Sequence, residues 1–166
     1  MSMPKKAGFP GLILLLGSLV TACTRLSPSP SPSPEAVRPG GRYYQAETGK
    51  AYADVLAELE LAITEHNFRI TGHNKIGSVI REREGKPYPD YDSFQFCNLT
   101  TAREILDLAP AAVIWMPCNI TVRQAGSQVI VTTLLLPTDS TDARLNALAT
   151  RINQQLKQIV DFAVEQ

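Results

Sequence analysis

The chain has 166 residues, enough for one domain with additional terminal segments. Sixteen basic and sixteen acidic residues cancel, and they are not gathered into runs. This balance excludes both the clustered basic face of a nucleic-acid-binding protein and an acidic interaction tail. An apolar content of 44% is ordinary for a globular protein, so we expect one folded domain with its own core.

The first residues have the pattern of an export signal. Lys5 and Lys6 precede an apolar run over residues 12–20, and small residues follow before Cys23. A charged start, a short apolar centre and a small-residue end are typical of a secretory signal peptide. The run is shorter than the roughly 20 apolar residues that a membrane-spanning helix needs. We therefore predict a signal peptide over residues 1–22, with an uncleaved anchor as the alternative.

Residues 20–23, Val-Thr-Ala-Cys, resemble the lipobox of bacterial lipoproteins. In that class the signal is cut before the cysteine, which carries a diacylglyceryl thioether and usually an N-acyl chain such as palmitate. The resemblance implies lipidation of Cys23, and two or more acyl chains hold a protein stably on a membrane. Thr24 is not aspartate, which by resemblance to enterobacterial sorting favours the periplasmic face of the outer membrane. Ordinary secretion is the alternative.

A linker follows over residues 23–42. Its centre, residues 27–34, is a pure Ser-Pro alternation. Proline fixes its own backbone angle and extends the residue before it, so the segment should form a semi-rigid polyproline II spacer. We interpret it as a stalk between the membrane and the domain; plain disorder is the alternative.

The first half of the domain, residues 43–166, alternates strand and helix patterns. Apolar residues at helical spacing predict one long helix, with Thr48 as its N-cap. Residues 76–80 suit a short helix, although a strand is an alternative. The elements predicted in chain order are a strand over 42–47, a helix from 48 to about 66, a strand over 68–72, the short segment at 76–80, a loop over 85–92 and a strand over 93–97.

In the second half, residues 101–104 form a capping box that predicts a helix ending before Pro110. Strand patterns follow over 111–116, 119–124 and 128–136, and the last two form a hairpin. An amphipathic helix runs from about residue 141 to the end. The predicted fold is α+β, a two-layer sandwich of about five mainly antiparallel strands with two long helices on one face.

With these elements in order, two Cys-Asn sites give the domain a family resemblance. Cys97-Asn98 follows a strand, a helix follows, and Pro117-Cys118-Asn119 leads into a β-branched run. This pattern resembles the domain of unknown function 302 family over roughly residues 43–137, although Leu99 stands where the family often has proline. The resemblance implies a small α+β domain, sometimes self-associating, with no agreed activity. A homodimer is therefore one expected partner state.

The candidate site residues are Cys97, Asn98, Cys118 and Asn119. Export favours a disulfide between the cysteines, because oxidising compartments preserve such bonds. Two inert, partly buried thiols are the second interpretation, and redox or ligand chemistry the third. The asparagine amides could cap or bridge the strand ends, or face a ligand.

The remaining candidates have simpler interpretations. We expect His66 to lie in the last turn of the first long helix, His73 to be exposed in a turn, and Trp115 to lie in the core. No catalytic set, metal site or cofactor motif is recognised. The sequence predicts a membrane-anchored envelope lipoprotein that presents a binding domain for an unknown ligand. A thiol-dependent redox or enzymatic role and a structural self-associating module are the alternatives.

Overall fold

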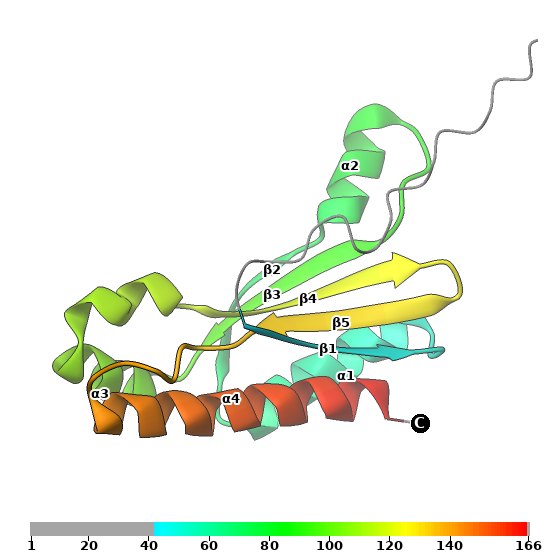
Figure 1. Cartoon of the computed structure of the whole chain (residues 1–166). Helices are drawn as coiled ribbons and strands as arrows, with labels where there is room; N and C mark the ends of the chain where they lie inside the picture. The colour runs from blue at the N-terminus through cyan, green and yellow to red at the C-terminus, as the bar shows by residue number, and fades with distance from the viewer. Residues whose placement is uncertain (1–41, 166) are drawn as a thin grey trace, which may run out of the picture. The chain divides into compact units, whose positions relative to one another are not determined.

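The computed structural model describes residues 42–165. The predicted signal peptide, Cys23 and most of the linker lie outside the described residues. Strands and helices alternate along the first half of the domain (Figure 1). The elements are β1 (Tyr43–Thr48), α1 (Tyr52–Glu65), β2 (Arg69–Asn74), α2 (Ile76–Glu84), β3 (Tyr91–Cys97), α3 (Leu99–Leu108), the 3-10 helix η1 (Pro110–Trp115), β4 (Cys118–Ala125), β5 (Gln128–Leu134) and α4 (Ala143–Val164).

The five strands form one sheet in the order β1-β5-β4-β3-β2, and every neighbouring pair is antiparallel. Helices α1 and α4 pack against each other and cover one face of this sheet, while α2 stands on its other side (Figure 1). The predicted α+β sandwich is confirmed.

The core lies between the sheet and the α1–α4 layer. Alternate residues of a strand point to the same face, so the paired Phe94 and Ile120 and the paired Val122 and Val131 all face the helices and are fully buried. Burying an apolar side chain of this size contributes roughly 1.5–3 kcal/mol. The helices supply the opposite side of the core with Val55, Leu59, Ile63, Leu156, Ile159 and Val160.

Two predicted helix starts were wrong. Helix α3 begins at Leu99, and its N-cap is Asn98, whose Oδ1 accepts a hydrogen bond from the Thr101 N–H at 3.0 Å. Helix α1 begins four residues after Thr48, because Thr48 still pairs with Val129 as the last residue of β1. In both places the preceding strand decides where the helix begins.

The strand predicted over residues 111–116 was also wrong, since η1 occupies this stretch. Pro110 stands in the first turn of η1, where its fixed backbone angle suits a helix and its missing N–H costs nothing. Short apolar runs have no periodicity long enough to separate strand from helix. The resulting turn leaves Ile114 81% exposed instead of burying it in a sheet.

Candidate binding site

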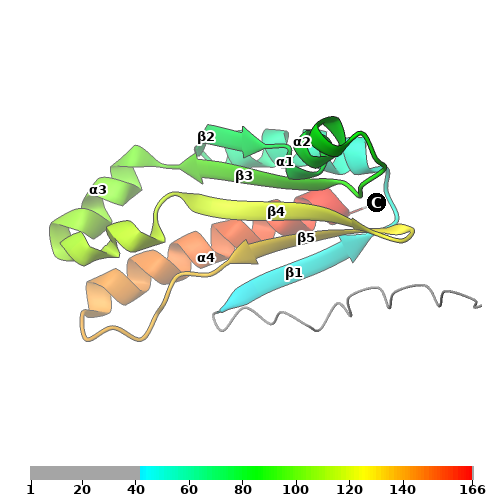
Figure 2. The same ribbon diagram turned by 90° about the horizontal axis from the view of Figure 1, so that it is seen from above.

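The central strands β4 and β5 separate at one end of the sheet. Their pairing ends at Ile120 and Thr133. Beyond this point β5 stays paired with β1 as far as Leu134, and β4 stays paired with β3 back to Cys118. Each strand thus follows its outer neighbour, and Figure 2 shows the two strands diverging toward α3 and the start of α4. The divergence opens the middle of the sheet.

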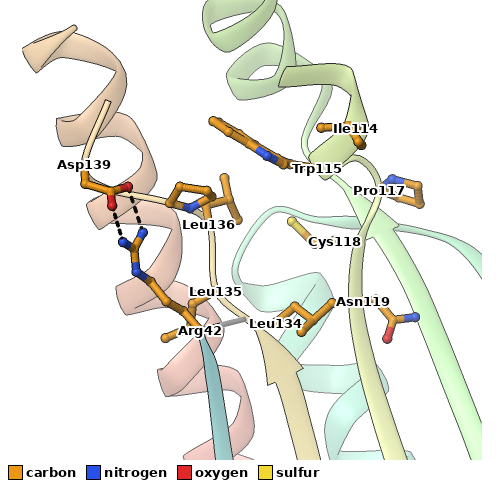
Figure 3. A pocket seen from close by; sticks show the side chains of 11 residues that line it. Arg42, Ile114, Trp115, Pro117, Cys118, Asn119, Leu134, Leu135, Leu136 and Asp139 are labelled. Atoms are coloured by element: carbon orange, nitrogen blue, oxygen red, sulfur yellow. Dashed lines mark hydrogen bonds and ion pairs between the residues drawn. The ribbon is translucent and has the colours of Figure 1, made fainter. Parts of the chain in front are cut away.

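A cavity of about 680 Å³ lies at this opening (Figure 3). Pockets that hold small ligands typically measure about 300–1,000 Å³, so its size is suitable. Its walls come from the start of β1, the η1–β4 junction and the segment after β5. The lining residues are Arg42, Ile114, Trp115, Pro117, Cys118, Asn119, Leu134, Leu135, Leu136, Pro137 and Asp139.

Most of the lining is apolar. Leu136 is buried and packs with the core, whereas Ile114 and Leu134 are largely exposed. Trp115, the single tryptophan of the chain, is half-buried: it packs against the core and also lies in the wall of the cavity. Large apolar side chains around a hollow indicate a contact surface, so these residues can receive an apolar group.

A buried asparagine on α4 fixes one wall of the cavity. The side-chain Oδ1 of Asn153 accepts a hydrogen bond from the Leu136 N–H at 2.8 Å, and its Nδ2 donates to the Leu136 carbonyl at 2.9 Å. The segment after β5 has no strand partner from β4, so this side chain replaces a neighbouring strand. The wall is therefore held at a fixed place on α4.

An ion pair is the charged part of the lining. Arg42 donates two hydrogen bonds to the Asp139 carboxylate, at 3.1 and 2.5 Å (Figure 3). Hydrogen bonding to Arg42 holds the pKa of Asp139 below its usual value, so both groups are charged at neutral pH. The backbone carbonyl of Arg42 also accepts a hydrogen bond from Leu135. Arg42, which the sequence assigned to the linker, is thus joined to the domain.

The two cysteines are free thiols, and the expected disulfide is not formed. Strand register explains this, because Phe96 lies opposite Cys118 and Cys97 lies opposite Arg69. Cys97 and Cys118 are therefore not directly opposite each other, although both line a second, much smaller cavity beside Ile105 and Met116. The disulfide expected from export is therefore the alternative state, which alkylation of the exported protein distinguishes from two free thiols.

The environment of the thiols opposes a reactive thiolate. Burial, with a further contribution from Cys97, raises the pKa of Cys118 to about 12. Burial also raises the pKa of Cys97. Nucleophilic and metal-binding cysteines need a lowered pKa. In the wall of the cavity, Cys118 is therefore a neutral, weakly polar group.

The predicted site residues are only partly brought together. Cys118 and Asn119 line the cavity, whereas Cys97 and Asn98 lie outside its lining. The amide of Asn98 caps α3 and also donates to the Asn67 carbonyl at 3.0 Å. The Asn119 amide donates to the Ser93 hydroxyl at 2.7 Å, which turns it toward β3. Both amide groups are therefore occupied by hydrogen bonds within the protein.

A buried polar network under α1 was missed by sequence reasoning. His73 lies in β2, where its Nε2 is 2.7 Å from one carboxylate oxygen of Asp92, and the Tyr52 hydroxyl donates to the other oxygen at 2.8 Å. The His73 ring stacks on Phe94, with centroids 4.0 Å apart, and its Nδ1 lies 3.6 Å from Glu60. The expected exposed turn at His73 was wrong.

The Asp92 side chain at the centre of this network is only 6% exposed. The network joins α1 to β2, β3 and β4, because the Tyr52 hydroxyl also contacts the Val122 carbonyl at 3.1 Å. A signal was present in the sequence: Asp92, Phe94 and Phe96 alternate, which places the carboxylate on the core face. His66 lies just after the last turn of α1, close to where it was expected.

Residues 44–163 match the family described as "Domain of unknown function DUF302". The chain belongs to this family. The match extends through α4, beyond residue 137, where the motif resemblance ended. A solved DUF302 structure, an uncharacterised conserved protein from Bacillus stearothermophilus, is 16% identical with a TM-score of 0.65 and covers 74% of this chain and 98% of that chain. No curated protein matches this chain.

At 16% identity, the likeness to the Bacillus protein shows a shared fold. In this DUF302 domain, Pro117, Cys118 and Asn119, the most specific part of the motif, supply one wall of the cavity. Within residues 42–165, no cluster of three or more His, Cys, Asp or Glu side chains could hold a metal ion. The helices of the same stretch are all too short or too polar to cross a membrane.

Proposed function

We propose that the protein is a lipid-anchored envelope lipoprotein whose DUF302 domain binds a small, largely apolar molecule between β4 and β5. The observation that carries the binding role is the cavity of about 680 Å³ with its apolar lining. The export signal, the lipobox at Cys23 and the Ser-Pro linker support the anchored location. We place the protein at the periplasmic face of the outer membrane.

The position of the cavity suits a tethered binding domain. Arg42, the last residue of the predicted linker, is the first residue that the structure describes, and it lines the cavity. A polyproline II spacer extends about 3.1 Å per residue, so the eight Ser-Pro residues span roughly 25 Å. The cavity therefore stays within reach of molecules at the membrane surface. Presenting or collecting such molecules is the role we propose.

Trp115 allows a direct test. It is the single tryptophan and lies in the wall, so its fluorescence reports on the cavity. We expect molecules extracted from the cell envelope to bind the chain from residue 24 onward, observed by native mass spectrometry, and to shift this fluorescence. Ile114→Asp, which adds a charge to the lining, should weaken binding. Leu99→Asp is the matched control, because Leu99 is similarly exposed, at 72%, and lies outside the lining.

Two results would reject the binding role. One is an extract in which nothing binds. The other is a bound molecule that leaves Trp115 fluorescence unchanged and is equally weakened by both variants. The thiol-dependent alternative has less support, because the pKa values of Cys97 and Cys118 are raised.

A further inference from the structure

The geometry points to a definite ligand class: an alkyl chain with an uncharged or zwitterionic polar head, as in a neutral lipid. This inference rests on the proposed binding function and adds the chemistry of the ligand. The alkyl chain would lie between β4 and β5, against Trp115 and Leu136. The polar head would lie at the Arg42–Asp139 ion pair.

The apolar walls of the cavity indicate where an alkyl chain would lie. Three consecutive leucines, Leu134 to Leu136, form one side, and Trp115 is the single aromatic residue of the lining. Aromatic rings stabilise one another by stacking, and this lining offers a flat aromatic ligand only Trp115, so an alkyl chain against the leucines is the better fit. Cys118 adds a neutral thiol to the opposite side. Nothing in this part of the cavity compensates a buried charge, so the ligand must be apolar here.

The Arg42–Asp139 ion pair indicates the charge of the polar head. Among the residues of 42–165 that line the cavity, Arg42 and Asp139 alone are charged, and their charges cancel. A guanidinium has five N–H donors, and two of those on Arg42 are directed to Asp139. The remaining donors, and the free lone pairs of the carboxylate, can bind hydroxyl, ester, amide or zwitterionic groups. The pair is largely exposed and has no net charge, so it offers a head group with a net charge no net electrostatic attraction.

Three probes with the same chain separate the head groups: decyl maltoside, which is neutral, decanoate, which is anionic, and decyltrimethylammonium, which is cationic. Each is titrated below its micellar concentration into the chain from residue 24 onward, with Trp115 fluorescence as the readout. We expect decyl maltoside to bind at least roughly threefold more tightly than either ion, the scale of an exposed charge interaction. Equal or tighter binding of an ion would overturn the inference.

Charge variants give a reciprocal test. Asp139→Asn leaves Arg42 unpaired, so decanoate should gain roughly threefold, and Arg42→Gln should give decyltrimethylammonium the same gain. Both side chains are at least 46% exposed, so the domain should fold in either variant. The matched controls are Arg103→Gln and Asp107→Asn, an exposed ion pair on α3 outside the lining. Equal effects of control and test variants would contradict the assignment of the head group.

The outcomes distinguish the two proposals. If an envelope molecule binds at Trp115 but no decyl probe does, the alkyl ligand is rejected and the binding function stands. If neither the extract nor any probe changes Trp115 fluorescence, both are rejected. If the decyl probes bind and each charge variant strengthens binding of its ion as described, both are supported.

Discussion

The side-chain amide of Asn153 pairs with both backbone hydrogen-bonding groups of Leu136, at 2.8 and 2.9 Å. Both residues are buried, so neither backbone group of Leu136 has water as a substitute partner. The Asn153 side chain on α4 makes the two hydrogen bonds that a neighbouring strand would otherwise make to Leu136. Its loss should therefore affect both the stability of the domain and the wall of the cavity.

Asn153→Ala should lower the free energy of unfolding by about 1–3 kcal/mol, because it leaves buried backbone groups unpaired. Urea unfolding of the purified domain measures this loss. Gln154→Ala is the matched control, since Gln154 is the next residue of α4 and is exposed. Equal stability of the two variants would show that the paired hydrogen bonds do not hold the segment.

Tyr52→Phe should destabilise the domain by a similar amount, about 1–3 kcal/mol, because it removes the hydroxyl that donates to the buried Asp92 carboxylate. Tyr88→Phe removes a hydroxyl from an exposed tyrosine and should change little. Thermal and urea unfolding of both variants measure the difference. If the Tyr52 variant were as stable as the Tyr88 variant, the network would not brace α1.

The raised pKa of Cys118 predicts a loss of stability at alkaline pH. Folding raises it from 9.0 to about 12, so the folded state retains the thiol proton more strongly than the unfolded state. The contribution is present in full below pH 9 and is lost as the pH rises toward about 12. Cys118→Ala should reduce this alkaline loss relative to the parent, measured as urea midpoints across that range. An unchanged pH profile would contradict the burial of the thiol.

The register of β3 and β4 predicts that both cysteines stay unbonded. Exported protein that is denatured without reductant should therefore gain two alkyl groups by mass. In the native state Cys97 should react faster than Cys118, whose pKa burial raises further. The single variants Cys97→Ser and Cys118→Ser assign the rates. Protein that resists alkylation until it is reduced would instead establish the disulfide predicted from export.

Cys23→Ala should block maturation and release the protein from the membrane or mislocalise it, because the lipobox cysteine is the proposed attachment point. Incorporation of labelled palmitate and membrane fractionation measure the effect. Ser27→Ala, which leaves the lipobox intact, is the control. Palmitate incorporation that persists without Cys23 would refute the anchor.

Periodicity in the sequence was sufficient to predict α1, α4 and most of the sheet. In a long amphipathic helix apolar residues recur at every turn, and in a half-buried strand they recur at every second residue, so the pattern repeats several times. It was insufficient at residues 111–116, where a short apolar run suits strand and helix equally. The first residue of a helix depends on where the preceding strand ends, and pairing with neighbouring strands determines that end. This is why Asn98, and not Thr101, caps α3.

The sites depended on contacts distant in the sequence. His73 meets Asp92 only because β2 and β3 pair with an irregularity between Ile70 and Gly72. The cavity forms because β4 stays paired with β3 and β5 stays paired with β1 where β4 and β5 separate. No local sequence pattern indicates this separation. The Pro-Cys-Asn segment correctly indicated one wall, but the opposite wall, held by Asn153, had no recognisable motif.

The attachment of the linker at Arg42 has a mechanical consequence. In the membrane-anchored protein that we propose, the domain would swing about the point where its tether is fixed, and that point is Arg42 in the lining of the cavity. The turn between β4 and β5 and the C-terminal end of α4 lie away from the start of β1 (Figure 1), so they would swing through wider arcs than the cavity. The cavity entrance stays at the pivot. In the proposed anchored protein, the height of the cavity above the membrane would then depend on the length of the tether and hardly on the orientation of the domain.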